Sequence, residues 1–199
     1  PVEQVRFANS GTEAVMMALK AARAHTGRPR IAKCEGAYHG SYDYAEVSLD
    51  PTPEAWGRNA PVSVAYAKGT PDNVLADVVT IPFNDTEAAV SLIREHGPEL
   101  ACVLVDPMPN RAGLAPADRA YLEALRKVTR EVGALLIFDE VITFRLGYRG
   151  AQGIWNIDPD LTTLGKIIGG GFPVGAIGGR RDVMAVFDPR PGKPALPHG

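Results

Sequence analysis

Ala134-Leu135-Leu136-Ile137-Phe138-Asp139-Glu140 is the stretch of this sequence that decides the fold. Its five apolar residues run without polar alternation, which predicts a strand buried on both faces of a parallel sheet. Functional residues of such sheets gather beyond the carboxyl ends of the strands, so we expect one of the two acids to face a ligand. A carboxylate there could bind a metal, a ribose or a protonated pyridine nitrogen, and these residues alone leave all three open.

Strand-length apolar runs alternate with helical patterns along the chain, which predicts βαβ units. The expected fold class is α/β, a three-layer α/β/α sandwich with a mostly parallel sheet. The expected strands are Arg30–Cys34, Val78–Ile81, Ala101–Val105, Ala134–Phe138 and Leu161–Leu164, and the expected helices are Thr12–His25, Thr86–His96 and Arg119–Val132. Between Asp43 and Asn73 the chain lacks periodicity, and we expect an irregular excursion near the site or at an interface. One hypothesis is that it lines the substrate entrance.

Length and composition predict one globular domain over residues 1–199, because single domains usually hold roughly 100–200 residues. The chain opens at Pro1 without a methionine and stops within a loop rich in glycine and proline. We therefore expect it to be a piece of a longer polypeptide, with parts missing at both ends.

Charge and cysteine usage narrow the class of function. A formal net charge of -2 with interspersed signs predicts no nucleic-acid partner and no membrane partner. No apolar stretch reaches the roughly 20 residues that span a bilayer. Cys34 and Cys102 lack the spacing of a disulfide framework or a zinc site, and the histidines lack metal-ligand spacing, so we expect no metal. These features favour a cytoplasmic protein that acts on small molecules.

Ser10-Gly11-Thr12-Glu13 follows an apolar run and opens a long helical pattern. Backbone N–H groups at such a helix start can hold a phosphate. The same residues also match a capping box, in which the serine and the glutamate satisfy free N–H groups. The two interpretations are compatible.

Lys166 lies in an apolar run that ends in Gly169-Gly170-Gly171. A buried lysine is paired, reactive or reaching for solvent, and one with a lowered pKa is a good Schiff-base former. A solvated lysine at a strand end is the simpler alternative. The nucleotide-binding alternative is weak, because Val174 stands where a dinucleotide fingerprint needs glycine and Ile167 stands where a P-loop needs Ser or Thr.

Four segments in this order resemble the class III aminotransferases among the fold-type I enzymes that use pyridoxal 5′-phosphate (PLP). The segments are Phe7-Ala8-Asn9-Ser10-Gly11-Thr12-Glu13-Ala14, Tyr38-His39-Gly40, Phe138-Asp139-Glu140-Val141 and Thr162-Thr163-Leu164-Gly165-Lys166 with Gly169-Gly170-Gly171. The likeness covers nearly the whole chain, which is similar to glutamate-1-semialdehyde 2,1-aminomutase and to the β-amino-acid aminotransferases. It implies the PLP-binding large domain of that family.

The resemblance implies two catalytic residues. Lys166 would bind PLP as a Schiff base and then carry a proton between the substrate carbon and the cofactor. Asp139 would pair with the pyridinium nitrogen, because a protonated ring is the stronger electron sink. The remaining cofactor-binding residues implied are Ser10, Gly11 and Thr12 at the phosphate, Tyr38 and Val141 on the two ring faces, and His39 and Glu13 as supporting groups.

Two departures from the family pattern bear on the activity. Asp106-Pro107 stands where many relatives have Glu-Pro, and Met108-Pro109-Asn110-Arg111-Ala112-Gly113 lacks the Gly-Asn-Met-Gly run of the aminomutase. We therefore expect an aminotransferase that moves an amino group from an amine donor to an oxo acceptor. The alternative is an aminomutase that moves the group within one semialdehyde. A non-catalytic binding domain is a third hypothesis, and it predicts no effect of Lys166→Ala.

The resemblance also implies a homodimer with shared active sites. The chain ends before the place where relatives have a Gly-Thr loop that reaches the phosphate of the neighbouring subunit's PLP.

Overall fold

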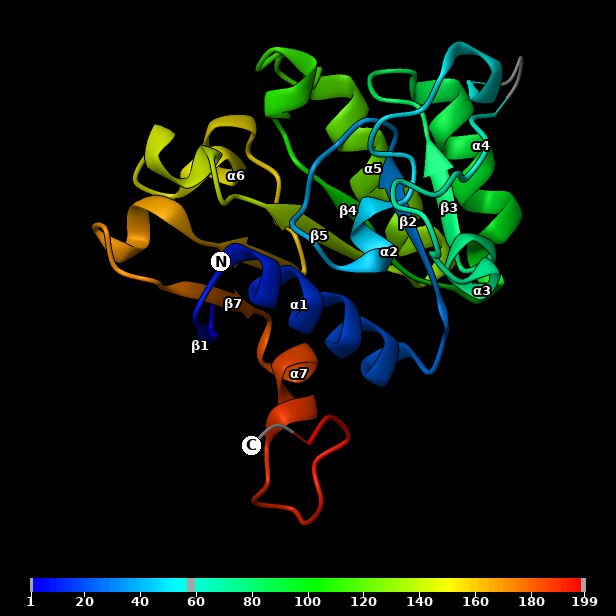
Figure 1. Cartoon of the computed structure of the whole chain (residues 1–199). Coiled ribbons are helices and arrows are strands. Elements are labelled where there is room, and N and C mark those ends of the chain that lie inside the picture. The colour runs from blue at the N-terminus through cyan, green and yellow to red at the C-terminus, as the bar shows by residue number, and fades with distance from the viewer. Residues whose placement is uncertain (1, 57–59, 198–199) are drawn as a thin grey trace.

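The computed structural model describes residues 2–56 and 60–197, and its centre is a seven-stranded sheet in the order β1-β7-β6-β5-β4-β2-β3. Figure 1 shows helices on both faces of this sheet. The strands are β1 Gln4–Ala8, β2 Arg30–Cys34, β3 Val78–Ile81, β4 Leu100–Val105, β5 Leu135–Asp139, β6 Leu161–Leu164 and β7 Gly175–Gly179. The helices are α1 Gly11–Thr26, α2 Asp43–Glu46, α3 Asp72–Ala76, α4 Thr86–His96, α5 Arg119–Val132, α6 Gly150–Trp155 and α7 Arg181–Met184.

The sheet is mostly parallel, as predicted. Neighbouring strands from β3 through β2, β4 and β5 to β6 pair in parallel, while β7 pairs antiparallel with both β6 and β1. Every residue of β4 and β5 is buried, which explains why these runs show no polar alternation. All five predicted strands are present, and the largest shift of an end is one residue.

Two strands were not predicted from the sequence: the edge strand β1 and its neighbour β7. The Val5–Ala8 run belongs to β1, while β7 has the sequence Gly-Ala-Ile-Gly-Gly, which is poor in the β-branched and aromatic residues that mark strands. Small residues are required at this place, because a Cβ on Gly175 would lie 2.1 Å from the carbonyl oxygen of Ser10. Close packing against the start of α1 therefore overrides strand propensity.

Two apolar cores fill the space between the sheet and its helices. One gathers residues of α1, α2, α3 and α7 against one face, and the other gathers residues of α4 and α5 against the opposite face. This is the predicted three-layer α/β/α sandwich. The bounds of α4 and α5 agree with the predicted ranges, and α1 extends one residue beyond its predicted range at each end.

The excursion between Asp43 and Asn73 contains only short helical turns: α2, a turn at Pro53–Ala55 and the start of α3. Residues 57–59 of it lie outside the described part of the chain. Within the described part, no helix is long and apolar enough to cross a membrane, and no three His, Cys, Asp or Glu residues gather as a metal site would require.

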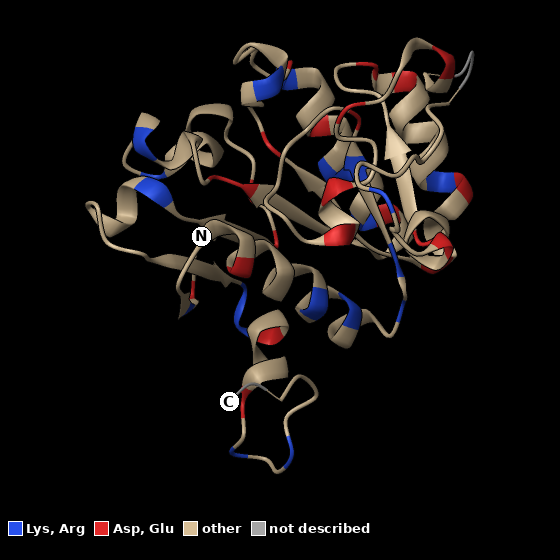
Figure 2. Ribbon diagram, in the orientation of Figure 1, with Lys and Arg blue, Asp and Glu red and all other residues tan. Residues whose placement is uncertain are grey.

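The parallel strands bring their carboxyl ends together at one edge of the sheet. Figure 2 shows acidic segments where β4 and β5 end at this edge. The start of α1 reaches the same edge, since α1 packs across β4, β5, β6 and β7. This convergence positions the candidate site.

Candidate active site

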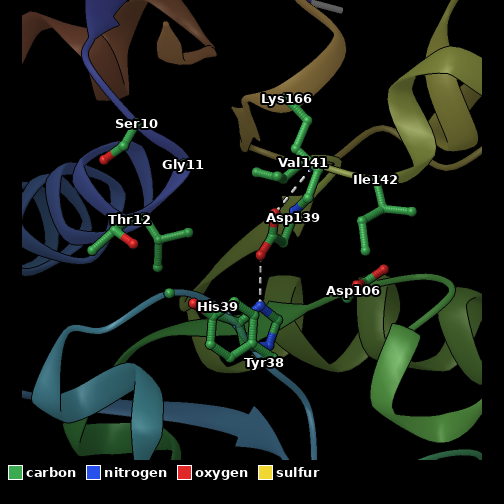
Figure 3. Close-up of a pocket in the computed structure, with 12 residues that line it drawn as sticks. Ser10, Gly11, Thr12, Tyr38, His39, Asp106, Asp139, Val141, Ile142 and Lys166 are labelled. Atoms are coloured by element: carbon green, nitrogen blue, oxygen red, sulfur yellow. Dashed lines mark hydrogen bonds and ion pairs between the residues drawn. The ribbon is translucent and has the colours of Figure 1, made fainter. Parts of the chain in front are cut away.

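The candidate site is a pocket at the carboxyl edge of the sheet. It is lined by Ser10, Gly11, Thr12, Val15, Tyr38, His39, Gly40, Asp106, Asp139, Val141, Ile142 and Lys166. All predicted site residues except Glu13 therefore share one cavity. Figure 3 shows them converging from the start of α1, the loop after β2 and the ends of β4, β5 and β6.

The first turn of α1 is a capping box and also one wall of the pocket. Ser10 is the N-cap, and its hydroxyl accepts a hydrogen bond of 3.1 Å from the backbone N–H of Glu13. The carboxylate of Glu13 turns back to accept a bond of 2.7 Å from the backbone N–H of Asn9. Glu13 thus supports the helix start from outside the pocket. The first N–H groups of a helix have no partner within the helix, so this turn can still hold an anion.

Three close contacts made by glycines shape this wall. The Cα of Gly11 would lie 3.3 Å from a Cβ built on Gly165, and a Cβ on Gly11 would lie 3.1 Å from the side chain of Val141. Gly40 has φ +89° and faces Thr12, whose Oγ1 would lie 2.5 Å from an added Cβ. Glycine is needed at these positions so that the loops after β2 and β6 can approach the helix start.

Asp139 ends β5 and faces the pocket with a fully engaged carboxylate. Its Oδ1 accepts hydrogen bonds from the Val141 backbone N–H and the Thr163 hydroxyl, both at 3.1 Å. Its Oδ2 lies 2.7 Å from Nδ1 of His39. Thr163 was not singled out from the sequence. Only the strand register, which places it opposite Asp139, shows that it orients the acid.

His39 is buried beside Asp139. Burial lowers the pKa of its imidazole, although the neighbouring carboxylate partly opposes that effect. A neutral imidazole donates from Nδ1 to the Asp139 carboxylate. We assign this tautomer from the hydrogen bond. Nε2 of His39 is also buried, and no described residue bonds to it.

The two acids that follow the β5 core have different roles. Glu140 is fully buried and turns away from the pocket, where its carboxylate accepts hydrogen bonds from the backbone N–H groups of Ala151 and Gln152 at 2.6 and 3.0 Å. These groups belong to the start of α6, and an acid is favourable at a helix start. Of the two acids, Asp139 lines the pocket and Glu140 does not, so Asp139 is the one that could face a ligand, which stays a prediction.

Lys166 lies at the rim of the pocket and is exposed, which corrects one part of the sequence analysis. The lysine is not buried in its apolar run. It begins a 3-10 turn just after β6, with the left-handed φ of +45°, so the chain has already left the core. Lys166 is exposed after the strand end, as the simpler alternative expected, and it also lines the pocket, so its reactive role stays a prediction. The buried lysine of the fold is Lys33.

Asp106 and Ile142 also line the pocket, although neither was predicted as a site residue. Asp106 follows β4 and is buried, and burial with the negative charge of Asp139 raises its pKa to about 7. The excursion between Asp43 and Asn73 supplies no described residue to the lining, so its predicted place at the site entrance lacks support.

A family model described as aminotransferase class-III matches residues 1–199, and the chain belongs to this family. The glutamate-1-semialdehyde 2,1-aminomutase of Caldivirga maquilingensis is 50% identical over 190 residues, 95% of this chain and 43% of that protein. An omega-transaminase from Sphaerobacter thermophilus is 57% identical with a TM-score of 0.94, covering 100% of this chain and 45% of that one. A β-phenylalanine aminotransferase from Variovorax paradoxus is 44% identical with a TM-score of 0.81, covering 100% and 41%.

The family resemblance predicted from the sequence is therefore confirmed, including its likeness to the aminomutase and to a β-amino-acid aminotransferase. The chain spans less than half the length of these relatives. PLP is the cofactor typical of the family, as predicted.

The pocket residues fit that cofactor. An anion-binding helix start lies on one side, a carboxylate held by three hydrogen bonds lies at the base, and a primary amine lies at the rim. Tyr38 offers an aromatic face and Val141 a branched apolar one. This donor set matches a ligand with a phosphate, a basic ring nitrogen and an aldehyde.

Proposed function

We propose that this protein is a PLP-dependent enzyme that transfers an amino group to and from carbon. The observation that carries the proposal is that Lys166, Asp139 and the start of α1 line one pocket. When bound, PLP supplies an electron-withdrawing ring that stabilises negative charge on the substrate carbon that bears nitrogen.

The chain's own groups then have separate tasks. Ser10, Gly11 and Thr12 would hold the phosphate at the helix start, and Tyr38 and Val141 would pack against the ring. Lys166 would hold the cofactor through its amine and could carry a proton at Nζ, because its exposed position at the rim leaves Nζ accessible.

Asp139 would pair with the ring nitrogen of the bound cofactor. The three hydrogen bonds that its carboxylate accepts hold both of its oxygens in place for this task. A neutral His39 fixes the carboxylate without adding a positive charge that would compete with the ring nitrogen for it.

The amino group could be transferred within one substrate molecule, as in an aminomutase, or between two molecules, as in an aminotransferase. The curated relatives with the aminomutase name support intramolecular transfer, which the sequence analysis kept as its alternative, better than the aminotransferase that it favoured. We therefore propose aminomutase-type transfer first. Intermolecular transamination is the second candidate, supported by the 57% identical omega-transaminase and by the Met108–Gly113 segment, which lacks the aminomutase run.

One experiment tests the proposal and separates the candidates. Amino donors are added singly to the PLP-loaded full-length protein without any acceptor, while the visible spectrum and released oxo product are followed. Loss of the cofactor band with one equivalent of oxo product indicates intermolecular transfer. Turnover of an amino-aldehyde without separate oxo product indicates the aminomutase. A protein that never shows a bound-cofactor band with excess PLP contradicts the proposal.

A homodimer with shared sites is also part of the proposal. Large apolar side chains are exposed on the two segments that border the rim: Leu146, Tyr148, Ile167 and Phe172. Segments 141–145 and 166–171 enclose an apolar depression there. Exposed apolar surface of this kind favours a partner subunit. Light scattering on the full-length protein should give a dimer mass, and a monomer would refute this part. Cytoplasmic location remains a prediction of the sequence.

A further inference from the structure

The inference concerns Asp106, and it rests on the proposed function. β4 and β5 pair in parallel with Val105 opposite Phe138, so Asp106 and Asp139 follow directly on neighbouring strands. Paired residues of parallel strands point to the same face of the sheet and lie roughly 5 Å apart. Both carboxyl groups line the same pocket. The strand register therefore places two acids side by side.

The two acids differ in how well their charges are supported. Asp139 accepts three hydrogen bonds, whereas Asp106 accepts one, from the backbone N–H of Met108 to Oδ1 at 2.9 Å. No described residue donates to the other oxygen, Oδ2, of Asp106. The residue is only 3% exposed, so solvent has little access to it. Two adjacent buried carboxyls do not both ionise readily, and a proton belongs on the one with fewer donors.

The other charged groups around Asp106 do not change the inference that Asp106, and not Asp139, carries the proton. Asp139 and Glu140 at the end of β5 disfavour its negative charge, while Lys166 after β6 favours it from an exposed position. The loop after β2 contributes His39, which burial keeps neutral, and β2 contributes the thiol of Cys34, whose pKa burial raises to about 11. Burial, followed by the charge of Asp139 and more weakly that of Glu140, raises the pKa of Asp106 to about 7, although the Met108 N–H and Lys166 oppose the shift.

The position of Asp106 in the pocket indicates which part of a bound PLP its carboxyl group would contact. Figure 3 shows Ser10 and Thr12 on one side of the pocket and Asp106 on the opposite side, with Asp139 and Lys166 between them. In PLP the phosphate arm and the phenolic oxygen lie on opposite sides of the line from the ring nitrogen to the aldehyde carbon. If the phosphate lies at the start of α1, the phenolic edge faces Asp106.

We propose that Asp106 is a further cofactor-contacting residue, whose protonated carboxyl donates a hydrogen bond from Oδ2 to the phenolic oxygen of PLP. Aspartate is one methylene shorter than the glutamate that many relatives have at this position. The Met108 N–H holds Oδ1 of Asp106, which leaves Oδ2 available to the cofactor. Deprotonation would replace the donor with a second negative charge beside Asp139 and the phenolate, and would weaken cofactor binding.

The test compares PLP affinity in wild type, Asp106→Asn and Asp106→Leu, one pH unit on either side of the pKa of about 7. The full-length proteins are used, and the cofactor's own titrations are common to all three. At about pH 6 wild type and Asp106→Asn should bind equally, because both donate a hydrogen bond. At about pH 8 wild type should bind up to about tenfold more weakly than Asp106→Asn, since one unit above a pKa leaves about one molecule in ten protonated.

Asp106→Leu removes the donor and should bind about tenfold more weakly than Asp106→Asn at either pH. Asp85→Asn is the matched control, because Asp85 caps α4 outside the pocket and asparagine caps equally well. It should bind PLP like wild type. A ratio of wild type to Asp106→Asn that does not change with pH would overturn the inference, as would tight binding by Asp106→Leu.

A second readout does not depend on PLP. The infrared carbonyl band of a protonated carboxyl should be present in the cofactor-free full-length protein at about pH 6, fade through neutral pH, and be absent from Asp106→Asn. A protein that shows this band but binds no PLP would refute the proposed function and leave the proton on Asp106 standing. A protein that binds PLP without this band would refute the inference alone.

Discussion

Two lysines lie near the same edge of the sheet in opposite surroundings. Lys33 on β2 is 0% exposed, and its Nζ donates hydrogen bonds to the carbonyl oxygens of Cys34 at 3.1 Å and Val47 at 2.8 Å. Burial lowers its pKa to about 8. Lys166 after β6 is exposed, lines the pocket and has no hydrogen bond to any described residue.

The difference shows that a buried lysine is not by itself a reactive one. The hydrogen bond from Nζ of Lys33 to the carbonyl oxygen of Val47 links residue 47 to the end of β2. It thereby ties together the two ends of the loop that contains Tyr38, His39 and Gly40. Lys166 lies where a ligand can reach its amine. Access to a pocket, more than burial, therefore distinguishes the candidate catalytic lysine from the structural one.

The largest expected effect comes from Lys166→Ala. Turnover of the full-length protein should fall by about a thousandfold or more, because covalent attachment and proton transfer are lost together. Thermal unfolding should change little, since the side chain is exposed. Steady-state kinetics measures the loss of turnover, and calorimetry measures the change in thermal unfolding. Unchanged turnover would refute the role of Lys166, and a wild type without turnover whose ligand binding survives Lys166→Ala would support the non-catalytic domain.

Lys33→Met should act on stability with a distinct pH dependence. Folding lowers the pKa of Lys33 from 10.5 to about 8, so the buried charge opposes folding below pH 8, and that cost disappears as pH rises towards 10.5. The free energy of unfolding of wild type should therefore rise relative to Lys33→Met by about 3 kcal/mol across this window.

Urea unfolding of both proteins at several pH values measures that difference. Lys166→Ala is the control, because it alters an exposed lysine and should follow wild type across the same window. If the free energies of unfolding of wild type and Lys33→Met change in parallel with pH, burial of the Lys33 charge does not oppose folding. That result would refute the proposed difference between the two lysines.

A pair of glycines gives the smallest expected effect. Gly40 lies in the loop that Lys33 fastens, and Gly170 lies in the turn after Lys166, both with positive φ. An added Cβ meets Thr12 at Gly40 and open space at Gly170. Both alanine variants should be destabilised by backbone strain. The free energy of unfolding of Gly40→Ala should fall by about 2 kcal/mol more because of overpacking. Denaturant midpoints compare them, and equal losses would contradict the close packing of this loop.

The sequence predicted much of this architecture because buried strands and amphipathic helices leave local patterns. The β5 run and the bounds of α4 and α5 follow from apolar periodicity alone. β7 could not be recognised in the same way, because its glycines satisfy a close approach to the Ser10 backbone and carry no strand signal. The site residues were recognised from the combination of four short motifs, and all but Glu13 line the pocket.

What the sequence alone determined is the class of fold, the family and eight of the residues that line the candidate pocket. Only the tertiary structure decided that Asp139 faces the pocket while Glu140 caps α6, that Lys33 is buried while Lys166 is exposed, and that Asp106 stands beside Asp139. The physical reason is that periodicity records whether a segment meets the core. The direction of a side chain at a strand end depends on strand register and on distant partners, which no local pattern encodes.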